Sequence, residues 1–143
     1  MLFSQDRNQM RQFFFDSWHK HKQGRPLEPL EALIAAVIEQ HPEYHRLLDD
    51  REACLARDYL PENGETNPFL HLGMHIAIQE QLATARPTGI TEIHAALRRR
   101  LQSEHEAEHA MMDCLAEMMW RAQRDQAPPD EDDYLRCLRR KCR

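Results

Sequence analysis

The chain has 143 residues, a length that suits one domain with a modest core. Hydrophobic residues make up 41% and charged residues 30% of it, and only four residues are glycine. This composition suits a helical protein and excludes collagenous, membrane-spanning and glycine-rich disordered chains. The formal net charge of -5 does not favour binding to nucleic acid or to an anionic membrane.

Apolar residues recur at helical rather than strand spacing along most of the chain. We therefore predict an all-α fold, a compact bundle of four to five helices with short loops, forming a single domain over residues 1–143. Ser4 caps the first predicted helix, and Gly24 ends it. A second helix begins near Pro29, and at Pro42 it either kinks or restarts.

The second half of the chain carries clear signals for helix starts. A polar loop holding a single helical turn is expected over residues 51–66, and Asn67 then caps a third helix. A helical pattern continues over residues 91–124, either as one helix or as two helices that break near Ser103. A short C-terminal helix over about residues 130–141 has acidic residues in its first turn and basic residues in its last, which complements its dipole.

The N-terminal segment lacks the apolar stretch of a secretory signal, and nowhere do roughly 18 apolar residues follow one another as a membrane span requires. We therefore expect a cytoplasmic protein without a membrane partner. No two cysteines form a C-x-x-C motif, so we interpret all four as reduced thiols. These are Cys54, Cys114, Cys137 and Cys142.

Nine histidines are the outlier of the composition, and six of them form three pairs in which the partners are four residues apart. Random placement would give about half of one such pair. The pairs are His41 with His45, His71 with His75, and His105 with His109. Residues at this spacing lie one turn apart on the same face of a helix, where two imidazoles can bind one metal ion.

Each pair extends an apolar stripe of its predicted helix, so we expect all six rings to face the core. Burying several imidazoles together is costly unless their lone pairs are engaged, and a metal ion engages them. We therefore predict the six histidines as candidate ligands of a transition metal, zinc or iron before others. Some nearby carboxylates could add ligands or orient a histidine: Glu43, Glu80, Glu106 and Glu108.

The third pair also permits an enzymatic interpretation. Residues 105–109 fit the His-Glu-x-x-His pattern of zinc hydrolases, with Glu106 as the general base, and also the reversed pattern through Glu108. Because the pattern is short and no strand is predicted beside it to bind a substrate peptide, this alternative is weaker than simple metal binding.

A non-enzymatic alternative treats the histidines as polar core residues. The protein would then be an interaction or regulatory module that binds a protein partner through its aromatic first helix or its charged C-terminal helix. Phe13, Phe14, Phe15 and Trp18 could equally form core or a homodimer face. The basic runs, residues 98–100 and 136–143, are interpreted as solvated surface rather than as a nucleic-acid site.

A set of short segments spread over nearly the whole chain is specific when taken together. It comprises Leu27–Glu31, His41–His45, Asn67–His71, Gly73, His75, Glu80, Gln81, Arg86, Pro87, Gly89, His105–His109, Met112, Trp120 and Tyr134. In these segments the chain resembles an uncharacterised bacterial family, domain of unknown function (DUF) 1841. The resemblance implies a small cytosolic bacterial protein and supplies no activity.

Overall fold

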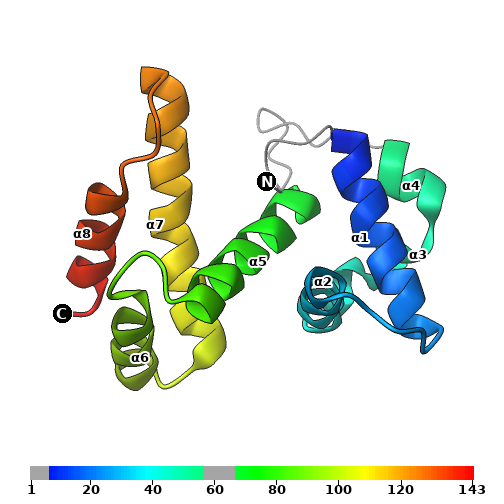
Figure 1. Cartoon of the computed structure of the whole chain (residues 1–143), viewed down its shortest axis with the longest axis horizontal. Coiled ribbons are helices and arrows are strands. Elements are labelled where there is room, and N and C mark those ends of the chain that lie inside the picture. Colours follow the sequence, from blue (N-terminus) through cyan, green and yellow to red (C-terminus); the bar gives the residue numbers. More distant parts are fainter. Residues whose placement is uncertain (1–6, 57–66) are drawn as a thin grey trace. The chain divides into compact units, whose positions relative to one another are not determined.

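The computed structural model describes residues 7–56 and 67–143 of the chain. The regular elements in these residues are all helical, which confirms the all-α prediction. They comprise eight α-helices and one short 3₁₀ helix, so the predicted four to five helices were too few. The chain divides into two compact units, residues 1–76 and 77–143, and the boundary lies inside helix α5 (Figure 1). The single domain expected from the length stays a prediction.

The first unit is built around α1. Its elements are α1 (Arg7–Lys22), α2 (Pro29–Glu39), the 3₁₀ helix η2 (Pro42–Tyr44), α3 (His45–Asp49), α4 (Arg51–Ala56) and the first part of α5 (Pro68–Thr84). Helix α1 lies against α2, α3 and α4 (Figure 1). The core of this unit contains Phe14 and Trp18 of α1, Ile34 and Ile38 of α2, and Phe69 and Leu72 of α5.

The break after α2 decides where the first histidine pair lies. Helix α2 begins at Pro29 as predicted, and the chain restarts at Pro42 instead of kinking there. Pro42 has no backbone N–H to continue the α-helical ladder, and His41 before it leaves the helical region with φ -125° and ψ 70°. His41 and His45 are therefore not one turn apart on a single helix.

The segment that follows α3 contains more helix than predicted. Helix α4 occupies Arg51–Ala56, whereas we expected a loop with a single turn. Asp50 stabilises its start, because the Asp50 carboxylate accepts hydrogen bonds from the N–H groups of Glu52 and Ala53. The predicted cap Ser4 and the rest of the predicted loop, residues 57–66, lie outside the described residues.

The second unit contains the remainder of α5 with α6 (Ile90–Leu101), α7 (Glu104–Asp125) and α8 (Glu131–Lys141). Helix α8 runs back along α7, and α6 contacts both of them (Figure 1). Its buried side chains include Ile90, Leu97, Met111, Met112, Tyr134 and Leu138. None of the described helices combines the length and the apolar surface that crossing a bilayer requires.

The predicted helix starts in this half of the chain are confirmed by their caps. Asn67 accepts hydrogen bonds from the N–H groups of the first turn of α5, at 3.0 Å and 3.3 Å. Ser103 caps α7 through the N–H of Glu106, so the pattern over residues 91–124 forms two helices. Asp130 caps α8 in the same way.

A charged contact between α1 and α2 yields a prediction about acid stability. The Lys20 ammonium lies 2.7 Å from the Glu31 carboxylate, which also accepts a hydrogen bond from the backbone N–H of Glu28. The ammonium, and secondarily the backbone N–H, lower the pKa of Glu31 below its usual value. A lowered folded-state pKa contributes stability that is present above the unfolded-state pKa and is lost as the pH falls through the folded-state pKa.

We expect Glu31→Gln, which keeps the helix cap and removes the charge, to be less stable than the wild type at about pH 7, with a smaller deficit at about pH 3. Urea unfolding at both pH values measures this difference. Glu52→Gln, an exposed carboxylate on α4, is the matched control. A Glu31→Gln deficit that persists unchanged in acid would contradict the electrostatic origin.

Candidate metal centre

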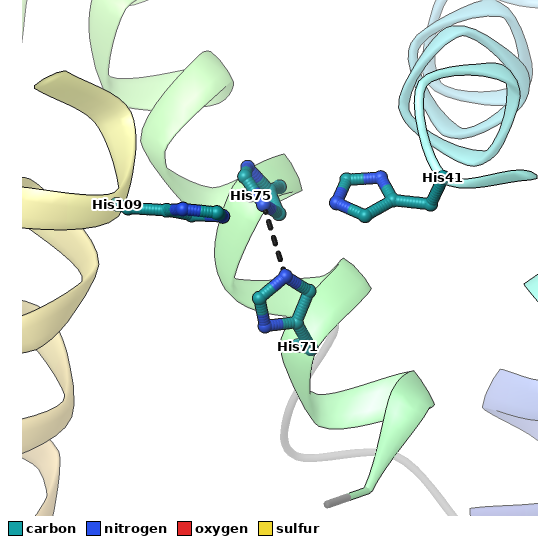
Figure 2. Close-up of side chains that lie close together, drawn as sticks. All are labelled: His41, His71, His75 and His109. Carbon is teal, nitrogen blue, oxygen red and sulfur yellow. Dashed lines mark hydrogen bonds between the residues drawn. The ribbon is translucent and has the colours of Figure 1, made fainter. Parts of the chain in front are cut away.

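Three histidines of the first unit converge. His41 precedes η2, and His71 and His75 lie one turn apart on α5 (Figure 2). The ring centroids of His41 and His75 are 4.6 Å apart, those of His71 and His75 4.8 Å, and those of His41 and His71 5.2 Å. Each ring offers one nitrogen such that these atoms lie within 4.8 Å of one another. Two nitrogens bound to one zinc ion lie at most about 4.2 Å apart, since zinc–nitrogen bonds are about 2.0–2.1 Å long, so small ring movements would let one cation touch all three rings.

The His41 ring is oriented by the backbone of its own preceding helix. Its Nδ1 lies 2.8 Å from the carbonyl oxygen of Val37. A carbonyl oxygen can only accept, so Nδ1 carries the proton and a neutral His41 has its lone pair on Nε2. A backbone carbonyl holding the second ring nitrogen is the usual arrangement around a metal-ligating histidine, because it sets both the tautomer and the ring direction.

His71 and His75 face each other through the same type of atom. Their Nε2 atoms are 3.3 Å apart, so one ring donates a proton to the lone pair of the other (Figure 2). A cation between them would take up both lone pairs, with the proton moving to an Nδ1 atom. Two imidazoles one turn apart on a helix provide the bidentate half of a zinc site.

The surroundings of these three rings are largely shielded from water. His41 is 3% and His75 1% exposed, whereas His71 is half-buried. Tyr44 stacks on His41 with the ring centroids 5.7 Å apart and meets His71 edge-on. Burial, and secondarily the charge of Glu43, raise the pKa of Tyr44. Tyr44 is therefore uncharged at neutral pH and covers one side of the histidine cluster.

His45, the other member of the first pair, occupies a different place. Its Nε2 donates to the carbonyl oxygen of Ile38 at 2.8 Å, and its ring packs on Trp18 with centroids 4.6 Å apart. The restart at Pro42 turns His45 away from His41, so the expected alignment of this pair is wrong. The geometry gives His45 the role of a satisfied core histidine.

The third pair belongs to the second unit. His105 and His109 lie on the first two turns of α7, with ring centroids 4.1 Å apart. His109 is half-buried, but His105 is exposed, so the expectation that both rings face the core is wrong for His105. The break at Ser103 explains this, because it places the apolar stripe that ends at Leu101 on a different helix from the pair.

Of the four carboxylates predicted to support the site, one is buried and three are exposed. Glu108 is 5% exposed, and its Oε2 accepts a hydrogen bond of 2.9 Å from the Nε2 of Gln79 on α5. Glu43, Glu80 and Glu106 are exposed. Within residues 7–56 and 67–143, the side chains that lie close enough together to hold a metal ion are histidines, and no carboxylate is among them.

The interpretation of all four cysteines as reduced thiols is wrong for two of them. Cys114 of α7 and Cys137 of α8 form a disulfide, with their Cα atoms 5.8 Å apart, while Cys54 and Cys142 are free. The pair is 23 residues apart and has no short motif, so only the return of α8 along α7 brings the two residues together. Burial raises the pKa of the free Cys54 thiol to about 11.

The fold and the site together define an all-helical protein with a largely buried cluster of histidines that could hold a metal ion. Residues 6–140 match the family described as Domain of unknown function (DUF1841), and the chain belongs to this family. The family resemblance inferred from the sequence is thereby confirmed. No curated protein and no solved structure matches the chain.

Proposed function

We propose that this protein binds one transition-metal ion through His41, His71 and His75 of the first unit. The observation that carries the proposal is the convergence of three imidazole nitrogens within 4.8 Å, one of them with its tautomer set by the Val37 carbonyl. Neutral imidazoles suit zinc and iron and disfavour calcium and magnesium, which prefer oxygen ligands.

Zinc takes four ligands in closed sites, and the first unit provides three histidines. The fourth position would be filled by a water molecule or by a further side chain. The predicted role of His105 and His109 as ligands stays a prediction.

We favour a metal-binding or metal-stabilised protein over a zinc hydrolase. The hydrolase interpretation would need both His105 and His109 on one ion beside Glu106, but His105 and Glu106 are exposed at the start of α7.

Elemental analysis of the untagged full-length protein tests the proposal. We expect close to one transition-metal ion per chain, or uptake of one Co²⁺ per chain after treatment with a chelator. A tetrahedral site made by the three histidines and one further ligand would give bound Co²⁺ an intense visible absorption. A protein that contains no metal as isolated and takes up none on titration would overturn the proposal and leave the histidines as polar core.

A further inference from the structure

A pocket of about 110 Å³ lies beside the disulfide of the second unit. Both cysteines line it, together with Glu117 and Arg121 of α7 and Arg140 of α8. A water molecule takes about 30 Å³ of liquid volume, so the pocket has room for the thiol end of a small molecule and not for a protein segment. The disulfide is thus open to small reactants.

The two cysteines that line this pocket differ in their exposed fraction. Cys114 is 1% exposed, whereas Cys137 is half-buried. Thiol–disulfide exchange requires a thiolate to reach one of the two sulfur atoms directly, so the accessible sulfur is the one attacked. The Sγ of Cys137 is therefore the electrophile, and the Sγ of Cys114 is the leaving group.

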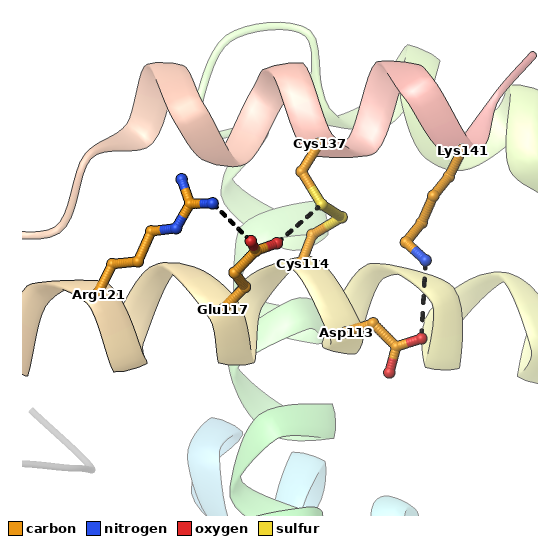
Figure 3. The surroundings of a disulfide bond; sticks show 6 residues. All are labelled: Asp113, Cys114, Glu117, Arg121, Cys137 and Lys141. Carbon is orange, nitrogen blue, oxygen red and sulfur yellow. Dashed lines mark hydrogen bonds and ion pairs between the residues drawn. A yellow bond between two sulfur atoms is a disulfide. The ribbon is translucent and has the colours of Figure 1, made fainter.

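Figure 3 shows the Glu117 carboxylate between the Sγ of Cys137 and the guanidinium of Arg121. The Oε2 of Glu117 lies 3.8 Å from the Sγ of Cys137, within reach of an S–H donor. The other carboxylate oxygen of Glu117 accepts a hydrogen bond of 2.7 Å from the guanidinium of Arg121. Glu117 is therefore held where it can accept a hydrogen bond from Cys137 once the disulfide is reduced.

Helix α8 has anchors other than the disulfide. Tyr134 is 1% exposed and donates a hydrogen bond of 2.7 Å to Gln81, and Leu138 is fully buried. Lys141 pairs with Asp113 of α7 at 3.7 Å, and its backbone carbonyl accepts a hydrogen bond from Arg100. Because these contacts do not depend on the S–S bond, α8 can stay in place when the bond opens.

From these observations we propose that Cys114 and Cys137 form a thiol-exchange site for low-molecular-mass thiols. A small thiolate attacks the Sγ of Cys137 and forms a mixed disulfide. The Cys114–Cys137 bond breaks, and Cys114 leaves as a thiolate that takes a proton from water. A second small thiolate attacks the small-molecule sulfur of the mixed disulfide, and Cys137 leaves and is protonated. Two small thiols are oxidised to one disulfide, and the protein disulfide is reduced to two thiols.

Single-cysteine trapping in the full chain tests the direction of attack. In a Cys142→Ser background, which removes the other half-buried thiol, Cys114→Ser leaves Cys137 free and Cys137→Ser leaves Cys114 free. With oxidised glutathione as the probe, we expect mixed-disulfide formation on Cys137 to be at least about tenfold faster than on Cys114, measured by intact mass. Cys54, which is buried in both variants, is the internal control.

Substitution of Glu117 tests whether its carboxylate acts on the Cys137 thiol. A neighbouring carboxylate disfavours the thiolate, so Glu117→Gln should shift the pH profile of Cys137 alkylation to lower pH in the Cys114→Ser/Cys142→Ser background. Asp113→Asn, an exposed carboxylate on the same helix, should not shift it. An unshifted profile for Glu117→Gln would overturn the role of Glu117.

Treatment of the wild-type chain with glutathione tests whether the disulfide exchanges at all. We expect oxidised glutathione to form the Cys114–Cys137 bond and reduced glutathione to open it while the far-ultraviolet circular dichroism stays unchanged. A pair that never oxidises, or a bond that opens only when the protein unfolds, would overturn the proposal. Equal trapping rates at Cys114 and Cys137 would also overturn it.

Discussion

Replacing His75 by alanine should abolish stoichiometric metal binding. His75 is the most buried of the three converging histidines and the one nearest to both other rings, so its loss removes the central ligand. We expect the metal content to fall from about one ion per chain to below about one tenth, with an affinity at least about 100-fold weaker. Elemental analysis and competition with a chromophoric chelator measure both quantities.

The same variant should lose the stabilisation that metal binding gives. A ligand that binds only the folded state at about 100 times its dissociation constant adds about 2.7 kcal/mol to the free energy of unfolding. Wild-type protein should gain this increment when metal is added, whereas His75→Ala, whose affinity is at least about 100-fold weaker, should gain at most about 0.4 kcal/mol. The absolute stability of His75→Ala also falls because a buried ring is lost. The gain in the free energy of unfolding on metal addition does not depend on that loss, so it reports the missing ligand alone.

Two histidines outside the cluster serve as controls for this prediction. His45→Ala removes a ring that is held by Ile38 and Trp18, and His19→Ala removes an exposed ring on α1. Both variants should keep the full metal content and the full increment. If His45→Ala lost the metal as His75→Ala does, the three-histidine assignment would be wrong.

Replacing Phe14 by alanine should lower the free energy of unfolding by about 3–5 kcal/mol. Phe14 is fully buried on α1, and its ring centroid lies 6.2 Å from that of Phe69 in the first turn of α5. The substitution leaves a cavity between the helix that organises the first unit and the helix that carries His71 and His75. Denaturant unfolding of the metal-free protein measures the effect.

The neighbouring residue is the matched control for Phe14. Phe13 has the same side chain on the same helix but is 36% exposed. Phe13→Ala should cost less than about 1.5 kcal/mol, since less apolar surface returns to water and no enclosed cavity forms. Similar losses for the two variants would mean that α1 is not packed as described.

Helix boundaries were predictable where the deciding interaction is local. Asn67 and Asp130 each cap a helix through N–H groups two or three residues away, so both helix starts are readable from the sequence. The same local chemistry left the alternatives at Pro42 and Ser103 open. Whether a helix bends or restarts depends on the packing of the segments that follow, which a short window of sequence does not contain.

Only part of the histidine site was predictable, again because the sequence determines local relations and not contacts between distant segments. The spacing of His71 and His75 by itself determined that they share a face of one helix, because helical periodicity sets that relation. Only the tertiary structure decided that His41 joins them while His45 turns to Trp18, and that Cys114 meets Cys137. These outcomes depend on contacts between residues far apart in the chain, and side-chain spacing along one helix carries no information about them.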